Sequence, residues 1–298
     1  MKVAVLTDSN SGITQAEGAR IGVSVLPMPF YISDQLYYED VTLTQEQFYQ
    51  HLEADEEIHT SMPVVGDVLD RWNSLLEEAD QLVYIPMSSG LSSSFMTART
   101  LAEDYKGKVQ VVDNKRISVT MRQSVFDAKT LADAGWDAVS IRHYLERTRK
   151  DSSIYIYVPN LKYLRKGGRV TAAAAALGAV LRIKPVLQIQ GEKLDAFAKC
   201  RTLKHAKATM LKAISDDIHD RFGLPDAENV WIAAAYSGLP REEVDEWHEE
   251  IQEAYPGKEI VMQQLPLSIS CHIGPGCLAV TVTKKLLASD IQNPPQGE

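Results

Sequence analysis

Cysteine is scarce in this sequence of 298 residues, which contains only three. Cys200, Cys271 and Cys277 show no metal-ligand spacing, and three thiols are too few for a disulfide framework. We therefore expect no structural metal site and no disulfide bonds. Buried, reduced thiols are the expected state of all three side chains.

Long hydrophobic runs are also missing, although 45% of the residues are hydrophobic. A membrane-spanning helix needs about 20 apolar residues. The nearest stretch, Ala172–Val180, is short, rich in alanine and followed by Arg182. Only four apolar residues separate Lys2 from Thr7, whereas the core of a signal peptide has roughly 7 to 15. These features predict a cytoplasmic protein with no membrane span.

Positive charge is in deficit, because 31 Lys and Arg residues face 40 Asp and Glu residues and give a net charge of −9. A negative protein gains nothing from the phosphate neutralisation that dominates nucleic-acid binding, so we expect no nucleic-acid partner. The glycine-rich Walker pattern that cradles nucleotide phosphates is absent too. We therefore do not expect the chain to bind ATP by itself.

The sequence does contain an alternation of short apolar runs with helical patterns. The runs are rich in β-branched or aromatic residues and end at turn residues, as buried strands do. Strands that alternate with helices form a parallel sheet covered on both faces. The predicted strands are Val3–Leu6, Leu82–Ile85, Val109–Val112, Ile154–Val158 and Val230–Ala235, and the predicted helices are Thr44–Leu52, Val68–Ala79, Ser92–Tyr105, Ser118–Ala134 and Trp136–Arg149.

The second half of the chain has a different pattern, with two strands joined at a short turn and two longer helices. We predict an α/β protein with a parallel-sheet, three-layer N-terminal domain over residues 1–155. A second, smaller α/β domain is predicted over residues 156–298. Its predicted strands are Lys184–Gln190, Leu194–Cys200 and Leu278–Thr283, and its predicted helices are Leu203–Phe222 and Glu242–Tyr255.

Polar loops follow two strands of the predicted parallel sheet, at Thr7–Gly12 and at Ser88–Ser94. Ligands of such sheets bind beyond the carboxyl ends of the strands. The second loop has five serines and precedes a helix, whose start offers unpaired N–H groups and a positive dipole end. One serine would be enough to cap the helix. The other four indicate a site for an anion or a carboxylate.

Three further segments carry candidate residues, and each has a plainer interpretation. Thr60-Ser61-Met62-Pro63 offers hydroxyl groups to a ligand or simply starts the next helix. Leu164–Arg169 offers arginine forks for a carboxylate or phosphate at a two-glycine turn, or is a solvated, charged turn. Cys271–Gly276 places His272 in a loop suited to close approach, although a lone histidine is more often structural.

The alanine-rich stretch Thr171–Ile183 is predicted to be a helix that is apolar on all sides and therefore buried. Its small side chains leave room for a closely packed neighbouring element or for the tail of a ligand. Close packing is the simpler interpretation of the residues alone.

Taken in order, these segments resemble the DegV family of fatty acid-binding proteins. The resemblance runs over nearly the whole chain, and although each motif alone is weak, all of them in this order are highly specific. The motifs are Thr7-Asp8-Ser9, Thr60-Ser61-x-Pro63, Ser88-Ser89-Gly90-Leu91-Ser92, Val112-Asp113, Leu161-x-x-Leu164-x-Lys166-Gly167-Gly168-Arg169, Ile183-Lys184-Pro185, Arg201-Thr202 and His272-x-Gly274-Pro275-Gly276.

The resemblance implies two α/β domains of the DegV type with one long-chain fatty acid bound between them. It implies no catalytic residue, no metal and no cofactor on this chain, so the fatty acid is the ligand. The residues that match the family's carboxylate site are Thr60, Ser61, Ser92, Ser93 and His272; those that match positions for phosphoryl transfer or kinase docking are Arg169 and Arg201; and those expected along the acyl tunnel are Ala175, Ala176 and Ala179.

In the characterised bacterial systems, such a protein presents its fatty acid to a separate ATP-dependent fatty acid kinase. The acyl phosphate then enters phospholipid synthesis. This chain departs from the family pattern at Met62, Val64, Arg182 and Ser93-Ser94, where Gln, Ser, Asn and Gly-Thr are usual. Replacing Gly by Ser adds bulk and removes backbone freedom, so the family's local geometry at Ser93 and its chain-length preference are not carried over to this chain.

A serine acyl hydrolase or esterase is the alternative function. Gly90-Leu91-Ser92 is similar to a nucleophile elbow, although Ser94 stands where that motif has glycine. His272 would be the base and Asp8 its orienting partner, since such triads are defined by geometry and not by chain order. Turnover of an ester that is abolished by Ser92→Ala would establish this function.

Overall fold

The computed structural model describes residues 1–177, 183–191 and 193–292. The chain forms two compact units. The first unit consists of Met1–Arg149, Pro266–Ser268 and the chain from Leu286 onward, and the second consists of Lys150–Leu265 and Ile269–Lys285. The sequence predicted a single boundary, between residues 155 and 156. Such a boundary does not describe the return of Pro266–Ser268 and of the chain from Leu286 to the first unit.

The first unit is built on a four-stranded sheet with the order β2-β1-β6-β7. All of its pairings are parallel, as the alternation of strands and helices predicts. In a parallel sheet the loops that follow the strands emerge at one edge, and this edge positions the polar loops of the unit. The strands are β1 (Val3–Asp8), β2 (Ser24–Leu26), β6 (Gln81–Ile85) and β7 (Val109–Val111).

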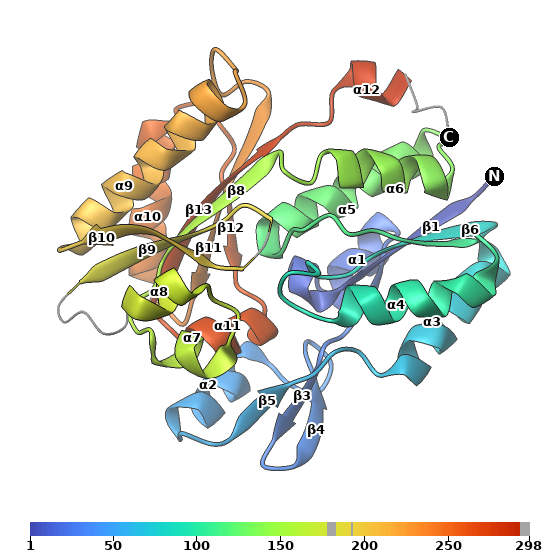
Figure 1. The fold of residues 1–298 in the computed structure, drawn as a ribbon, viewed down its shortest axis with the longest axis horizontal. Coiled ribbons are helices and arrows are strands. Elements are labelled where there is room, and N and C mark those ends of the chain that lie inside the picture. Colours follow the sequence, from blue (N-terminus) through green and yellow to red (C-terminus); the bar gives the residue numbers. More distant parts are fainter. Residues whose placement is uncertain (178–182, 192, 293–298) are drawn as a thin grey trace. The chain divides into compact units, whose positions relative to one another are not determined.

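Helices cover both faces of this sheet (Figure 1). Alternate side chains of a strand point to opposite faces, so β1 and β6 contribute to two separate cores. Val5, Val83 and Ile85 pack with α5 (Ser118–Asp133) and α6 (Ala138–Arg147), whereas Leu6, Leu82 and Tyr84 pack with α3 (Val65–Glu78) and α4 (Ser94–Ala102).

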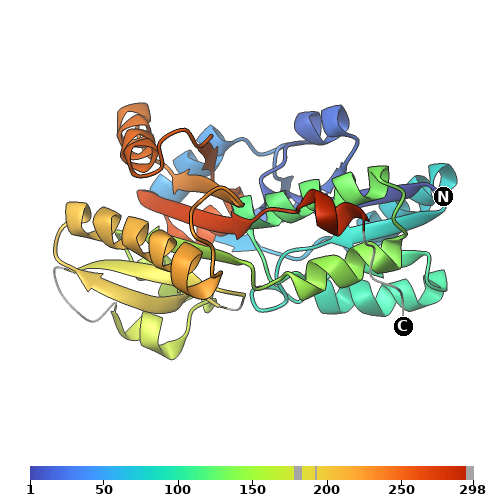
Figure 2. The same cartoon turned by 90° about the horizontal axis from the view of Figure 1, so that it is seen from above.

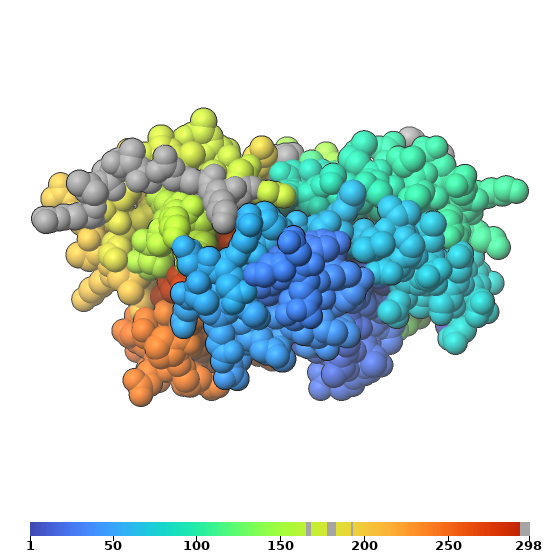
Figure 3. Space-filling view, turned by 90° about the horizontal axis from the view of Figure 1, so that it is seen from below, coloured from blue at the N-terminus to red at the C-terminus, as the bar shows by residue number. Residues whose placement is uncertain are grey.

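A small antiparallel sheet with the order β4-β3-β5 was not predicted from the sequence. Its strands are only three or four residues long, and the hairpin between β3 and β4 turns at Ser33 and Asp34, which both have positive φ. Such short strands give no clear alternation of apolar residues. The surface of this segment is blue in Figure 3. The elements are β3 (Pro29–Ile32), β4 (Gln35–Tyr38) and β5 (Ile58–Thr60), with α1 (Gln15–Ile21) before them and α2 (Gln45–Glu53) between β4 and β5.

The second unit contains a six-stranded sheet with the order β10-β9-β8-β13-β11-β12. Its pairings are antiparallel except for β11 with β12. Two long helices, α9 (Leu203–Asp216) and α10 (Arg241–Ala254), share one hydrophobic core with this sheet (Figures 1 and 2). The strands are β8 (Ser152–Tyr157), β9 (Lys184–Ile189), β10 (Asp195–Cys200), β11 (Val230–Ser237), β12 (Val261–Gln264) and β13 (Cys277–Lys284).

The alanine-rich stretch forms helix α8 over Ala172–Leu177, and residues 178–182 of the predicted helix lie outside the described residues. Ala174 and Leu177 are buried, but Ala172, Ala173 and Ala176 are exposed. The expectation of burial on all sides is therefore wrong for the described turns. A single methyl group loses little by remaining in water, so alanine does not require burial as leucine does. The other short helices are α7 (Lys162–Gly167), α11 (Leu267–Ile273) and α12 (Ala288–Gln292).

The three cysteines form no disulfide bond, and Cys200 and Cys277 are buried while Cys271 is half-buried. Across residues 1–177, 183–191 and 193–292, no helix is both long enough and apolar enough to cross a membrane. The same residues contain no group of three or more His, Cys, Asp or Glu side chains arranged to hold a metal ion.

The two tryptophans of the second unit test its core. Trp247 is fully buried and its Nε1–H donates to the Ala279 carbonyl at 3.2 Å, whereas Trp231 is 40% exposed. We expect Trp247→Ala to lower the free energy of unfolding by about 3–5 kcal/mol, because a large cavity is left. Trp231→Ala should change it by about 0.5 kcal/mol. Denaturant titration measures both values, and equal losses would contradict this account of the core.

Candidate functional site

The loop Ser88–Ser94, here called the serine loop, connects β6 to α4 and is folded back on itself. The backbone N–H groups of Leu91 and Ser92 both donate to the Ser88 carbonyl, at 3.0 and 3.1 Å. The Ser88 hydroxyl accepts from the N–H of Gly90 at 3.2 Å, and Ser88 is buried. Ser88 therefore shapes the turn and is not available to a ligand.

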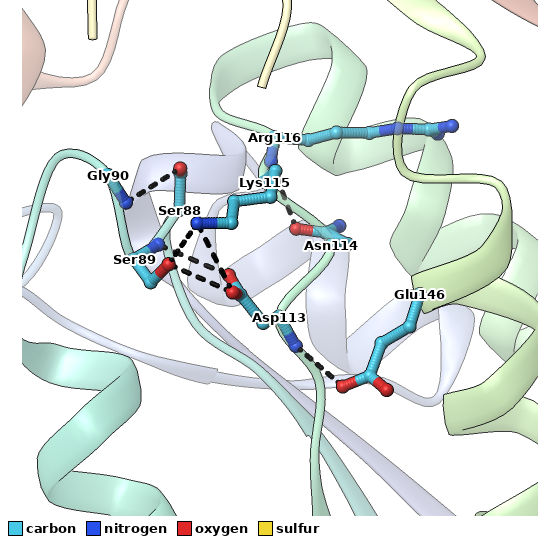
Figure 4. Close-up of polar contacts among 8 residues, drawn as sticks. All are labelled: Ser88, Ser89, Gly90, Asp113, Asn114, Lys115, Arg116 and Glu146. Carbon is cyan, nitrogen blue, oxygen red and sulfur yellow. Dashed lines mark hydrogen bonds and ion pairs between the residues drawn. The ribbon is translucent and has the colours of Figure 1, made fainter. Parts of the chain in front are cut away.

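Ser89 is held by the loop that follows β7 (Figure 4). Its hydroxyl donates to Asp113 Oδ2 at 2.9 Å and accepts from Lys115 Nζ at 2.7 Å. Asp113 and Lys115 form an ion pair of 3.5 Å, and their side chains are only 15% and 19% exposed. Two of the five serines thus serve to fix the loop itself, which the count of hydroxyl groups could not show.

Ser92 and Ser94 form the second half of the serine loop, where the hydroxyl oxygens lie 2.8 Å apart. The Ser94 N–H donates to Ser92 Oγ at 3.2 Å. A hydroxyl accepts two hydrogen bonds and donates one, so with Ser94 as donor the Ser92 proton is left for an acceptor such as a carboxylate. The helix α4 begins at Ser94, two residues later than predicted, and its N-cap Ser93 is exposed and makes no side-chain capping bond.

The second hydroxyl-bearing segment, Thr60 and Ser61, lies beside the serine loop. Thr60 is the last residue of β5, and Ser61 N–H donates to the Pro29 carbonyl at 3.3 Å. Met62 then lies against the start of α4, since its sulfur accepts from Ser93 Oγ at 3.8 Å. The segment that carries Thr60 and Ser61 therefore meets the loop that carries Ser92 and Ser93 at the Met62–Ser93 contact of the first unit.

Met62 is one of the residues that line a narrow, mainly apolar pocket of the first unit. The volume of the pocket is about 10 Å³, which is room for about one water molecule. An acyl chain cannot enter this pocket unless the side chains around it move, and methionine is the most adaptable of the apolar side chains. The lining includes Met62, Pro63, Val68, Tyr84, Ala98 and Leu101.

Asp8, at the end of β1, is hydrogen-bonded to Met87, the residue before the serine loop. Its Oδ2 accepts from the N–H of Met87 at 2.8 Å, and its Oδ1 accepts from the N–H and the Nδ2 of Asn10 at 2.9 and 2.8 Å. Burial raises the pKa of Asp8 to about 6, although these hydrogen bonds oppose the shift. Both oxygens of Asp8 are thus used inside the first unit, where they hold Asn10 and Met87 in place.

Ser92 also lacks the backbone geometry of a nucleophile elbow. That motif holds its serine on a sharp, strained turn, whereas Ser92 is not among the described residues with positive φ. The geometry of Asp8 and Ser92 therefore gives no support to the hydrolase alternative.

His272 lies in the last turn of α11, and the loop after it is tightly anchored in the second unit. The Ser237 hydroxyl donates to the Gly274 carbonyl at 2.7 Å, and the Gly276 N–H donates to the Ser237 carbonyl at 2.6 Å. Gly274 has a φ of 77°, and a Cβ at this position would lie 2.3 Å from the ring of Tyr163. Only glycine fits here, so Gly274 allows α7 to pack closely against this loop.

Burial and, to a smaller extent, the positive charge of Arg169 together lower the pKa of His272 to about 4. His272 is therefore neutral at pH 7, and a neutral imidazole can donate one N–H to a carboxylate. Arg169 itself is exposed. The second unit thus brings two predicted residues within electrostatic range of each other.

The remaining predicted residues are less defined by the structure. Arg201 is exposed and precedes Thr202, the N-cap of α9. Ala175 is half-buried and Ala176 is exposed, while Ala179 lies outside the described residues. Their predicted roles at the phosphoryl group and along the acyl chain remain predictions.

Comparison with known proteins identifies the family. The DegV family model matches residues 2–285. The chain belongs to the DegV family. A DegV domain-containing protein of Staphylococcus aureus is 26% identical over 284 residues, which cover 95% of this chain and 99% of that protein. A DegV domain-containing protein of Deinococcus radiodurans is 32% identical over 215 residues, or 72% of this chain and 76% of that protein.

Solved DegV structures share the fold over nearly the whole chain. A DegV family protein from Thermus thermophilus, described as binding fatty acid, matches with a TM-score of 0.86 and 28% identity over 96% of this chain and 100% of that one. DegV from Bacillus subtilis, a fatty acid-binding protein, matches with a TM-score of 0.83 and 26% identity over the same shares. The predicted family and the predicted α/β fold class are confirmed.

Sequence reasoning did not identify Lys115 or Glu39 as residues that shape the site. Lys115 lies two residues after Asp113, which belongs to one of the family motifs. The sequence therefore indicated this segment but not the role of Lys115. Glu39 lies between two other polar residues, Tyr38 and Asp40, and no local pattern indicates that it is buried. Only the tertiary structure shows the contacts of Glu39.

The titration of His272 tests the electrostatics of this region. We expect a pKa near 4 in the ligand-free protein, because burial and Arg169 both disfavour the imidazolium. Arg169→Gln should raise this pKa, whereas the control Arg201→Gln should leave it unchanged. Nuclear magnetic resonance of the imidazole Cε1–H measures all three values. A His272 pKa near 6.5 in the unaltered protein would contradict the burial described above.

Proposed function

We propose that this DegV family protein binds one long-chain fatty acid and holds its carboxylate with Thr60, Ser61, Ser92, Ser93 and His272. The observation that carries the proposal is similarity over the full chain to two DegV proteins that bind fatty acids. The adjacent hydroxyl segments of the first unit support it, because the carboxylate of such a ligand needs hydrogen-bond donors.

The head group fits the chemistry of these donors. A carboxylate that leaves water is strongly disfavoured unless it is hydrogen-bonded. The Ser92 hydroxyl has a proton available when Ser94 donates to it, and neutral His272 supplies one N–H. Hydroxyl and imidazole donors select a carboxylate over an apolar chain end, so the head group sets the orientation of the ligand.

The acyl chain supplies most of the affinity in this proposal. Burying one methylene contributes about 0.8 kcal/mol, so about 14 methylenes contribute roughly 11 kcal/mol. The loss of translational and rotational freedom offsets several kcal/mol of this gain. We propose that Ala175, Ala176 and Ala179 line the acyl tunnel, since small side chains leave the volume that a chain needs.

We further propose that the protein presents the bound carboxylate to a separate, ATP-dependent fatty acid kinase in the cytoplasm. The product would be an acyl phosphate for phospholipid synthesis. The chain has no Walker motif, so the nucleotide comes with the partner. Phosphoryl transfer depends on positioning and on neutralising phosphate charge, and the exposed Arg169 and Arg201 are the residues proposed to supply that charge.

Removal of the hydroxyl donors tests the carboxylate site. Each donor removed from a buried carboxylate costs about 1–3 kcal/mol, so we expect Thr60→Ala and Ser92→Ala each to weaken hexadecanoic acid binding by roughly 10- to 100-fold. Thr100→Ala is the matched control, because Thr100 is an exposed hydroxyl residue of α4. Isothermal titration calorimetry measures the affinities. Unchanged affinity in both site variants would remove these residues from the proposed site.

The two arginines test the division between binding and phosphoryl transfer. We expect Arg169→Ala and Arg201→Ala to copurify with fatty acid and yet to lose acyl-phosphate formation by a cognate kinase. The control is Lys204→Ala, which removes an exposed cation from the first turn of α9. Lipid occupancy is measured by mass spectrometry and phosphorylation with labelled ATP. If the arginine variants lose lipid as well, the arginines belong to the head-group site.

A further inference from the structure

Glu39 is a buried carboxylate that joins three segments of the first unit. Its Oε2 accepts from the Ser9 hydroxyl at 2.5 Å, and its Oε1 accepts from the N–H of Leu267 at 2.5 Å. Ser9 in turn accepts from the N–H of Met28 at 3.1 Å. Glu39 therefore links Ser9, directly after β1, to Leu267, which lies 228 residues after Glu39 in the chain.

The neighbouring residue of that segment is held by the same loop. Ser268 donates its hydroxyl to Asn10 Oδ1, and Asn10 Nδ2 donates to Asp8. Because the amide nitrogen of Asn10 is used by Asp8, its oxygen must face Ser268. Two consecutive residues, Leu267 and Ser268, are thus attached to the loop after β1 by a continuous hydrogen-bonded network.

These two residues begin α11, the helix whose last turn carries His272. The first N–H groups of a helix have no partner within it, and Glu39 provides the partner for Leu267. Leu267 and Ser268 group with the first unit, whereas the chain from Ile269 to Lys285 groups with the second. The network therefore holds the chain at the point where it passes from one unit to the other.

Burying a carboxylate has a large desolvation penalty, so this side chain is an unfavourable choice for a purely structural role. Burial and the charges of Asp8 and Asp40 raise the pKa of Glu39 to about 7, although its two hydrogen bonds oppose the shift. Apolar packing of similar volume would avoid this desolvation. Groups with perturbed pKa values concentrate at functional sites. The segment that Glu39 holds in place is the start of α11.

We propose that Glu39 is a positioning residue that fixes His272 by holding the first turn of α11. It touches neither the ligand nor a reacting atom. Its effect on fatty acid affinity rests on the proposed function, whereas its effect on His272 is a property of the ligand-free protein.

The first measurement therefore needs no lipid. His272 is titrated by nuclear magnetic resonance in Glu39→Ala, Glu39→Gln and the control Glu53→Gln, which alters an exposed glutamate at the end of α2. We expect Glu39→Ala to shift the His272 pKa towards its ordinary value. Glu39→Gln should keep it, because the amide oxygen still accepts from Leu267. An unchanged His272 titration in Glu39→Ala would overturn the proposal, and circular dichroism confirms that each variant is folded.

The second measurement compares hexadecanoic acid with hexadecanol, which has the same chain and no carboxylate. Glu39→Ala should weaken binding of the acid on the order of tenfold and leave binding of the alcohol unchanged. In a His272→Ala background, Glu39→Ala should cause no further loss, because both changes remove the same contact. Equal losses for acid and alcohol, or additive losses in the double variant, would contradict positioning through His272. If the unaltered protein binds neither lipid, the proposed function fails, and the His272 titration still decides the role of Glu39.

Discussion

A carboxylate that is removed from water must be hydrogen-bonded, and this requirement governs both the protein and its proposed ligand. Asp8 and Glu39 meet it with donors from Asn10, Met87, Ser9 and Leu267, all at or near the carboxyl edge of the parallel sheet. The donors come from segments far apart in sequence. The hydrogen bonds to these two buried carboxylates therefore fix the geometry of the loops that carry the candidate site.

The same requirement divides the serine loop into two parts. Ser88 and Ser89 bond to the loop itself and to the Asp113–Lys115 pair, so they hold the backbone in place (Figure 4). Ser92 is left with a proton to donate when Ser94 donates to it. A rigid scaffold with one hydroxyl proton left to donate suits a binding site, because little conformational freedom is lost when a ligand arrives.

The sequence predicted the elements whose signals are local. The apolar runs of β1, β6 and β7 and the helical spacing of α5 marked the parallel sheet correctly. The small sheet β4-β3-β5 was missed because its strands are too short to show alternation. Glu39 was missed for a different reason: it accepts a hydrogen bond from Leu267, and no local pattern encodes a partner so distant in sequence. The exposed face of α8 shows that an all-alanine pattern does not establish burial.

The lipid content of the purified protein tests the central proposal most directly. The protein is denatured and extracted, and fatty acids are quantified by mass spectrometry against the protein concentration. The account predicts one long-chain fatty acid per chain, or saturation at that stoichiometry after delipidation and titration with hexadecanoic acid. The absence of extracted fatty acid together with the absence of binding in the titration would contradict it.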